Sequence, residues 1–172
     1  MKDLFLIAGY FGNFDEFKKE IKERGLSFHE LRGMRWSDGS SLLEQSIGNR
    51  QYDTAEYLLK HHWPVNVVTK EGCNEFHYLA SWIHEERALE IGWELLKRGV
   101  DLAQQDKKHK NTAMLSLYIR LLPWASTSDR HRTFLKACLD KKQGITEINK
   151  YGYCVRSTPI NEKYKEILPL LF

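Results

Sequence analysis

Seven histidines and three cysteines are the residues of this chain that could ligate a metal ion or act as a catalytic base or nucleophile. His61 and His62 are adjacent, so on a helix their side chains point about 100° apart and do not face one ion together. The sequence contains no HExxH, CxxC or GxSxG pattern and no phosphate-binding glycine loop. We therefore expect no metal site, no cofactor and no enzymatic activity.

A short basic run, Lys107, Lys108, His109 and Lys110, lies within the polar segment QQDKKHKN. Such a run is either a solvated loop or a contact for an anionic partner. An acidic protein surface suits it better than DNA, because neither a basic helix nor an aromatic stacking platform accompanies it. The whole chain carries 26 basic and 23 acidic residues, and this near balance does not indicate nucleic-acid binding.

Residues 38–66, DGSSLLEQSIGNRQYDTAEYLLKHHWPVN, show the pattern that must position such groups. The spacing predicts a turn, a short helix with Leu43 and Ile47 on one side, a polar break and a second helix. Neither helix is large enough to bury its own apolar face. Gly39 is matched by Gly72, 33 residues later, which is a period expected for stacked helix-turn-helix units.

This segment resembles an ankyrin repeat, whose usual form is a DG turn, a TPLH-like helix start, a second helix ending in LL and a glycine exit leading to VN. The next unit opens at Glu71 and Gly72, and its end, LLKRGVDLA, matches the same form. The resemblance implies an all-α ankyrin-repeat solenoid of about four to five repeats with degenerate terminal caps. We expect a single domain over residues 1–172, with approximate repeats 1–33, 34–67, 68–105, 106–149 and 150–172.

Several local features follow from this alignment. His77 takes the TPLH histidine place, which implies a structural hydrogen bond to a neighbouring loop. His62 replaces the glycine that normally adopts a left-handed conformation, so we expect mild strain or a changed turn there. The third unit is four residues longer than the second, and we place the extra turn in a lengthened first helix over residues 81–87.

The ends of the predicted units are less regular. Residues 29–37 are expected to form a hairpin loop, and Pro123 to stop the first helix of the fourth unit. Asn161 is expected to cap a closing helix that contains Tyr164, Ile167 and Leu168. The apolar tail of Leu170, Leu171 and Phe172 either tucks onto the last repeat or contacts a partner.

The family binds other proteins through hairpin tips and the concave helix face, without catalysis. The partner-binding residues that this implies are Arg35, Trp36, Lys70, Glu71, Tyr78, Trp82, Lys107, Lys108, His109, Lys110 and Tyr151. Aromatic side chains on a solvent-facing side are favoured interface anchors. For Trp82 an equally good alternative is packing on the lengthened neighbouring helix.

The expected partner is another protein, either a cognate toxin that this chain neutralises as an immunity protein or an ordinary target of a scaffold, adaptor or effector. We expect no nucleic acid and no membrane contact, because no run approaches the roughly 18 apolar residues of a membrane span. Asp3 and the lack of a small-residue cleavage pattern argue against a signal peptide. An odd number of cysteines without a CxxC pair fits reduced, mostly structural thiols. We expect a cytoplasmic location, and separately a monomer.

Overall fold

The computed structural model describes residues 3–9, 14–159, 164–165 and 169. Within these ranges the chain forms nine α-helices and no β-strand, which confirms the expected all-α class. The helices are α1 (Leu4–Gly9), α2 (Phe14–Glu23), α3 (Phe28–Gly33), α4 (Leu42–Gly48), α5 (Tyr52–Lys60), α6 (Glu75–Ala80), α7 (Glu86–Lys97), α8 (Ala113–Ala125) and α9 (Asp129–Asp140). None of the helices in the described ranges is long and apolar enough to cross a membrane.

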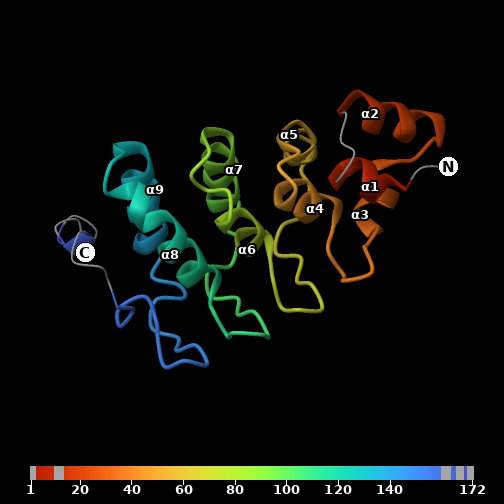
Figure 1. Ribbon diagram of the computed structural model, residues 1–172. Coiled ribbons are helices and arrows are strands. Elements are labelled where there is room, and N and C mark those ends of the chain that lie inside the picture. The colour runs from red at the N-terminus through yellow and green to blue at the C-terminus, as the bar shows by residue number, and fades with distance from the viewer. Residues whose placement is uncertain (1–2, 10–13, 160–163, 166–168, 170–172) are drawn as a thin grey trace.

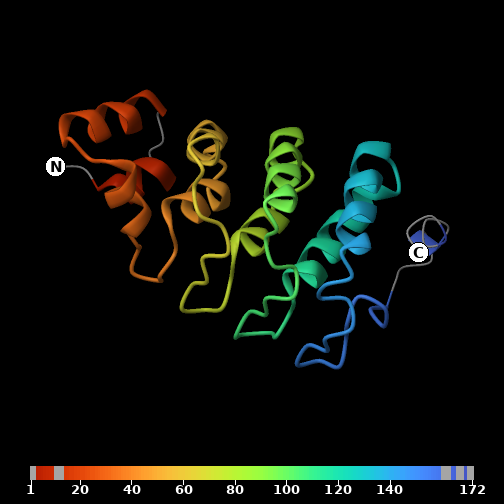
Figure 2. The ribbon, with the colours of Figure 1, turned by 180° about the vertical axis from the view of Figure 1, so that it is seen from behind.

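The helices lie in a row of pairs. The pairs α4 with α5, α6 with α7 and α8 with α9 stand side by side, and α1 to α3 lie at one end (Figure 1). Along the row α1, α4, α6 and α8 contact one another in turn, and α2, α5, α7 and α9 form a second line of contacts. The loops that lead from one pair to the next project from the same side of the row, which the opposite view also shows (Figure 2).

One hydrophobic core runs through the whole row. Leu43, Ile47, Leu58, Phe76 and Leu79 are fully buried and belong to the same cluster. These residues lie at the helical spacings of their sequence pattern, so each helix buries one stripe against its neighbours. A helix of six or seven residues is marginal in water alone, and this packing supplies the stability that it lacks.

Polar side chains fix the starts of the short helices. The backbone N–H of Ser41 donates to Glu44 Oε2 at 2.7 Å, and the Thr112 hydroxyl accepts the N–H of Leu115 at 3.0 Å. His77 Nδ1 lies 3.2 Å from the backbone N of Asn74, and its Nε2 lies 3.3 Å from the carbonyl oxygen of Asn111. His77 therefore links its helix to the next loop, which is the structural role expected for it.

Helix α3 corrects one expectation, because it occupies part of the segment expected to be a hairpin loop. Ser27 begins it with a capping box: its N–H donates to Glu30 Oε2 at 2.8 Å, and its hydroxyl accepts the N–H of Glu30 at 3.3 Å. Only residues 36–40 form the tight turn, in which the N–H of Trp36 donates to the carbonyl of Ser40 at 2.9 Å. The Ser-x-x-Glu pattern was the available sequence signal.

The expectation of a lengthened first helix in the third unit is wrong. Helix α6 ends at Ala80 and is one residue shorter than α4, whereas α7 has 12 residues and α5 has nine. The four extra residues therefore lengthen the second helix and the linker before it. Pro123 does not stop α8, which continues to Ala125, because a proline in the last turn removes only one backbone hydrogen bond.

His62 adopts the left-handed conformation itself, with φ of 55°. Gly99, at the same place after α7, has φ of 75°. The turn is unchanged: the N–H of Trp63 donates to the carbonyl of Leu58, and the N–H of Val100 donates to that of Leu95, both at 3.2 Å. Of the two expected outcomes, strain at a non-glycine residue is therefore the one found.

Some expectations lie outside the described residues. The sequence predicts a break between two helices at Gly12 and Asn13, and these residues lie outside the described ranges, as do most of the closing helix after Asn161 and the tail of Leu170, Leu171 and Phe172. Tyr164 and Lys165 are described and form a short 3₁₀ turn.

Candidate functional site

Four turns project from one side of the helix row, and we call them the turn row. They comprise residues 36–40, 69–73, 106–111 and 149–153. Each is closed by a hydrogen bond from the N–H of its first residue to the carbonyl of its last, as in Thr69 to Cys73 at 2.9 Å and Asn149 to Tyr153 at 2.8 Å. The third turn is one residue longer than the others and carries the basic run.

Backbone hydrogen bonds join each turn to the next. The N–H groups of Lys70, Lys107 and Lys150 donate to the carbonyls of Asp38, Glu71 and His109, at 2.8, 2.8 and 3.0 Å. Two lysine side chains add to these links: Lys70 Nζ donates to Ser37 O at 2.8 Å, and Lys150 Nζ donates to Lys108 O at 2.6 Å. The turn row is therefore a continuous edge rather than four independent loops.

The carboxylate of Asp106 organises the third turn from within. Asp106 is buried; its Oδ1 accepts the N–H of His109 at 2.6 Å and its Oδ2 accepts the N–H of Asn111 at 3.0 Å. Its carbonyl accepts the N–H of Lys110 at 3.0 Å, and Lys110 has a left-handed φ of 58°. These contacts fix the backbone from which the lysine side chains extend.

Exposed apolar residues gather beside these lysines. Ile148, Tyr151 and Tyr153 are 63%, 58% and 42% exposed. The Tyr151 ring stacks on His109 with centroids 5.9 Å apart, and Lys150 Nζ lies 5.0 Å above the Tyr151 ring. We call the surface formed by the third and fourth turns the C-terminal patch; it contains Lys107, Lys108, His109, Lys110, Ile148, Lys150, Tyr151 and Tyr153.

Three lysines of this patch are unpaired. Lys107, Lys108 and Lys110 are exposed, and their ammonium groups form no ion pair in the described part of the chain. Lys70 differs, because its ammonium group is held against Ser37 O. Lys70 therefore links two neighbouring turns, whereas the side chains of Lys107, Lys108 and Lys110 are free.

The other residues expected at the turns lie along the same row. Glu71 is exposed and its carbonyl accepts the N–H of Lys107. Arg35 and Trp36 lie at the far end, where the Arg35 guanidinium donates to the carbonyls of Arg32 and Met34. Trp36 packs on Phe5 with ring centroids 5.3 Å apart. The structure therefore does not bring this pair together with the C-terminal patch.

Tyr78 and Trp82 are half-buried against the preceding first helix. Trp82 Nε1 donates to the carbonyl of Gly48 at 2.8 Å, and a Cβ atom added to Gly48 would lie 2.8 Å from Tyr78 Cδ1. The Arg50 guanidinium covers the Trp82 ring at 5.1 Å. Trp82 thus packs on a neighbouring helix as one alternative supposed, although on α4 and not on a lengthened helix.

Three patch residues were missed by sequence reasoning: Ile148, Lys150 and Tyr153. They flank the turn at Tyr151 and Gly152. The left-handed φ of Gly152, 85°, is close to that of Gly39. The sequence signal that could have located these residues is the recurrence of the turn glycine at position 152. The unit around it matches the repeat pattern too weakly to show which side chains the turn presents.

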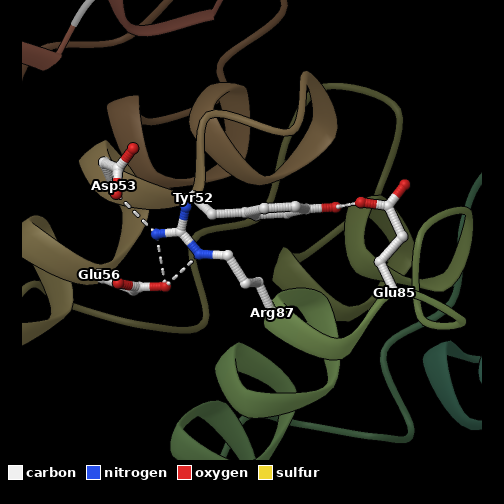
Figure 3. A network of polar contacts seen from close by, with 5 residues as sticks. All are labelled: Tyr52, Asp53, Glu56, Glu85 and Arg87. Carbon is white, nitrogen blue, oxygen red and sulfur yellow. Dashed lines mark hydrogen bonds and ion pairs between the residues drawn. The ribbon is translucent and has the colours of Figure 1, made fainter.

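A second polar cluster bridges α5 and α7 (Figure 3). Arg87 donates to Asp53 Oδ1 at 2.7 Å and to Glu56 Oε1 at 2.9 and 3.0 Å, while the Tyr52 hydroxyl donates to Glu85 Oε2 at 2.9 Å. Arg87 pairs with Asp53 and Glu56, and Glu85 pairs with Arg50 from the loop before α5, so the cluster clamps two helix pairs together.

Two of the three cysteines, Cys73 and Cys138, are placed as ordinary thiols. Cys138 is fully buried and burial raises its pKa; burial also raises the pKa of Cys73 to about 11. Both thiols are therefore protonated at neutral pH and poor nucleophiles. The described ranges hold no group of three His, Cys, Asp or Glu side chains placed to bind a metal ion.

The C-terminal patch thus offers cations and exposed rings on a rigid edge, which are groups suited to binding. No protein-family model matches the sequence, and a search of curated proteins finds no similar protein.

Proposed function

We propose that this protein is a non-catalytic protein-binding module of the ankyrin type and that the C-terminal patch is its principal contact with a partner protein. The observation that carries this proposal is that the fourth turn, at which Ile148, Tyr151 and Tyr153 are exposed, is hydrogen-bonded to the third turn, which carries the unpaired Lys107, Lys108 and Lys110. Exposed aromatic anchors rimmed by charge are typical of protein interfaces. The fixed turns lower the entropy that binding would cost.

Three features support the ankyrin assignment. Helix pairs recur with connecting turns on one side, His77 reaches the next loop, and His62 and Gly99 share a left-handed exit. Hydrogen bonds that join the pairs span about one repeat, as in Trp82 to Gly48 over 34 residues. Stacked repeats of this period are expected to show such regular contacts between neighbouring units.

Within this class the favoured function is that of a dedicated inhibitor, an immunity protein that neutralises a cognate toxin. The basic third turn is one residue longer than the others, the unit that follows the aromatic fourth turn matches the repeat pattern weakly, and the two turns together form the patch. Departures from the repeat pattern that lie together on one surface are suited to the recognition of a single partner. The alternative is a scaffold, adaptor or effector that binds ordinary partners through the same edge. Both versions imply a cytoplasmic monomer without a cofactor.

The test is charge reversal at the free lysines. A variant with Lys107→Glu, Lys108→Glu and Lys110→Glu should lose at least tenfold in affinity for the purified partner that the wild-type protein captures from its host. A matched variant with Lys60→Glu, Lys97→Glu and Lys136→Glu, three exposed lysines on second helices, should bind normally. Equal affinity of the two variants would show that the patch is not the contact surface.

The number and activity of partners separate inhibitor from adaptor. A single one-to-one complex whose toxic activity disappears on binding supports the immunity function. Several unrelated partners, each bound weakly and without loss of activity, would favour the adaptor.

A further inference from the structure

We infer that the C-terminal patch recognises a carboxylate-rich surface of a protein and discriminates against phosphate groups. This inference rests on the proposed protein-binding function and specifies the chemistry of the partner. It follows from how the third turn uses its backbone amides, from the type of its cations and from the apolar residues beside them.

The third turn has already filled its own anion site. Successive backbone N–H groups in a turn form a concavity that binds phosphate or carboxylate. Here the Asp106 carboxylate occupies it, since its two oxygens accept the N–H groups of His109 and Asn111 at 2.6 and 3.0 Å. The N–H of Lys107 donates to Glu71 O and that of Lys110 to Asp106 O. Four of the five amides in residues 107–111 are thus used inside the protein.

The cations of the patch are all lysines. Phosphate recognition favours arginine, because its planar guanidinium binds two oxygens at once, whereas a lysine ammonium acts as a hydrated point charge. Lys107, Lys108 and Lys110 attract an acidic surface without imposing bidentate geometry. Glu71, on the preceding turn, is exposed and forms no ion pair with them in the described residues, and Asp106 is buried and bonded to the backbone of its own turn.

The distribution of charge along the chain also favours an acidic partner at the patch. Residues 104–150 contain ten Lys and Arg against four Asp and Glu, whereas residues 1–103 contain 13 against 17. The basic end of the row therefore steers acidic partners toward the patch. Such steering acts chiefly on the association rate and weakens with salt.

The exposed apolar residues supply the short-range contact. Ile148 and Tyr151 are the two most exposed large apolar residues described. The Tyr151 ring is positioned by its contacts with His109 and Lys150. An apolar side chain of the partner, surrounded by carboxylates, complements this arrangement. Loss of Tyr151 should then raise the dissociation rate, while loss of the lysines should lower the association rate.

The experiment compares three probes by NMR titration of the full ¹⁵N-labelled protein: a peptide of Glu residues around one central Leu-Tyr pair, a phosphoserine peptide of equal net charge, and inorganic phosphate. The glutamate peptide should give saturable shifts at residues 107–110 and 149–153, with about tenfold weaker binding when salt rises from roughly 50 to 200 mM. The two phosphate probes should not saturate. Tighter binding of either phosphate probe would overturn the inference.

Two variants sharpen the test. The triple reversal at Lys107, Lys108 and Lys110 should abolish the glutamate-peptide shifts, and the control reversal at Lys60, Lys97 and Lys136 should preserve them. Asp106→Ala empties the amide concavity and should gain saturable phosphate binding. If that variant proves unfolded by circular dichroism, the wild-type comparison of the three probes still decides.

The remaining outcomes also discriminate. If the glutamate peptide fails to bind while the partner protein still depends on the free lysines, the inference fails and the proposed function stands. If light scattering at low salt shows a dimer that the triple reversal dissolves, the acidic part of a second copy is the occupant and an external partner is excluded for this patch.

Discussion

The carboxylate of Asp106 accepts the backbone N–H of His109 at 2.6 Å and so fixes the turn that carries the three free lysines. Asp106→Ala removes this contact and the one to Asn111, leaving two N–H groups without their acceptor. We expect the free energy of unfolding to fall by about 2 kcal/mol, because hydrogen bonds to a buried charge are stronger than average. Urea denaturation measures this change.

Asp140→Ala is the matched control, since Asp140 is exposed and has no ion pair in the described ranges. It should change the free energy of unfolding by less than about 0.5 kcal/mol. Amide hydrogen exchange should accelerate at His109 and Asn111 in Asp106→Ala alone. Equal stability of the two variants would mean that the Asp106 carboxylate does not organise the turn.

Glu44 gives the protein a pH-dependent stability. Its side chain is fully buried, its Oε1 has no hydrogen-bond partner, and burial, aided by the nearby Glu75, raises its pKa from 4.5 to about 8. Below pH 4.5 both folded and unfolded states are protonated. Between pH 4.5 and 8 only the folded state keeps the proton, so stability falls as pH rises through this window.

Glu44→Gln should remove that fall, because the amide stays neutral and its oxygen can still accept the N–H of Ser41. As pH rises from 5 to 8, the stability of the variant relative to the wild type should increase by roughly 3 kcal/mol, measured by urea denaturation. Glu30→Gln is the control in an exposed capping box of the same type, where hydrogen bonds from Ser27 lower the pKa of Glu30. The effect of Glu30 should have the opposite sign: the wild type loses the contribution of Glu30 to stability as pH falls, and Glu30→Gln lacks this pH dependence. A parallel pH profile for wild type and Glu44→Gln would refute the role of Glu44.

Residues with strict spacing could be placed from the sequence. Leu43, Ile47 and Leu58 fall on buried stripes because helical periodicity alone determines which side they face. Helix α3 could also have been predicted from Ser27 and Glu30. The linker before α7 could not, because four added residues can lengthen either helix without changing the pattern.

The candidate site was predictable only in part, for a similar reason. The basic run marked the third turn, but whether a lysine is free or tied depends on the neighbouring turn, as Lys70 and Ser37 show. Tyr78 and Trp82 were expected on a binding face, and they are half-buried because Gly48 leaves room for the Tyr78 ring and its carbonyl accepts the indole N–H of Trp82. Contacts between units are set by packing and leave little trace in local sequence.

His62 is the residue where a single change should stabilise the fold. Its φ of 55° costs a non-glycine residue about 1 kcal/mol, whereas Gly99 meets the same requirement freely. His62→Gly should therefore raise the free energy of unfolding by about 0.5 kcal/mol after the added chain entropy is counted. Lys60→Gly, in the last turn of α5, should lower it by a similar amount. A thermal midpoint that falls in both variants would contradict the strain at His62.

Arg87 ties α7 to α5, and the same arrangement recurs where Arg130 of α9 pairs with Glu86 of α7. Because the Arg87 side chain is 43% exposed, solvent screens its pairs with Asp53 and Glu56. Arg87→Met removes both the carboxylate pairs and the guanidinium that lies 5.6 Å from the Tyr52 ring centroid, and it should cost only about 1 kcal/mol in urea denaturation at low salt.

Salt distinguishes this clamp from simple packing. Raising ionic strength toward 1 M should shrink the loss in Arg87→Met toward zero, because the screening length falls to about 3 Å. Arg120→Met is the control, since Arg120 is exposed and has no ion pair in the part of the chain that the structure describes. In a double-mutant cycle, Arg87→Met and Asp53→Asn should couple, whereas Arg120→Met and Asp53→Asn should add. A salt-independent loss would assign the contribution of Arg87 to its contact with the Tyr52 ring instead of its carboxylate pairs.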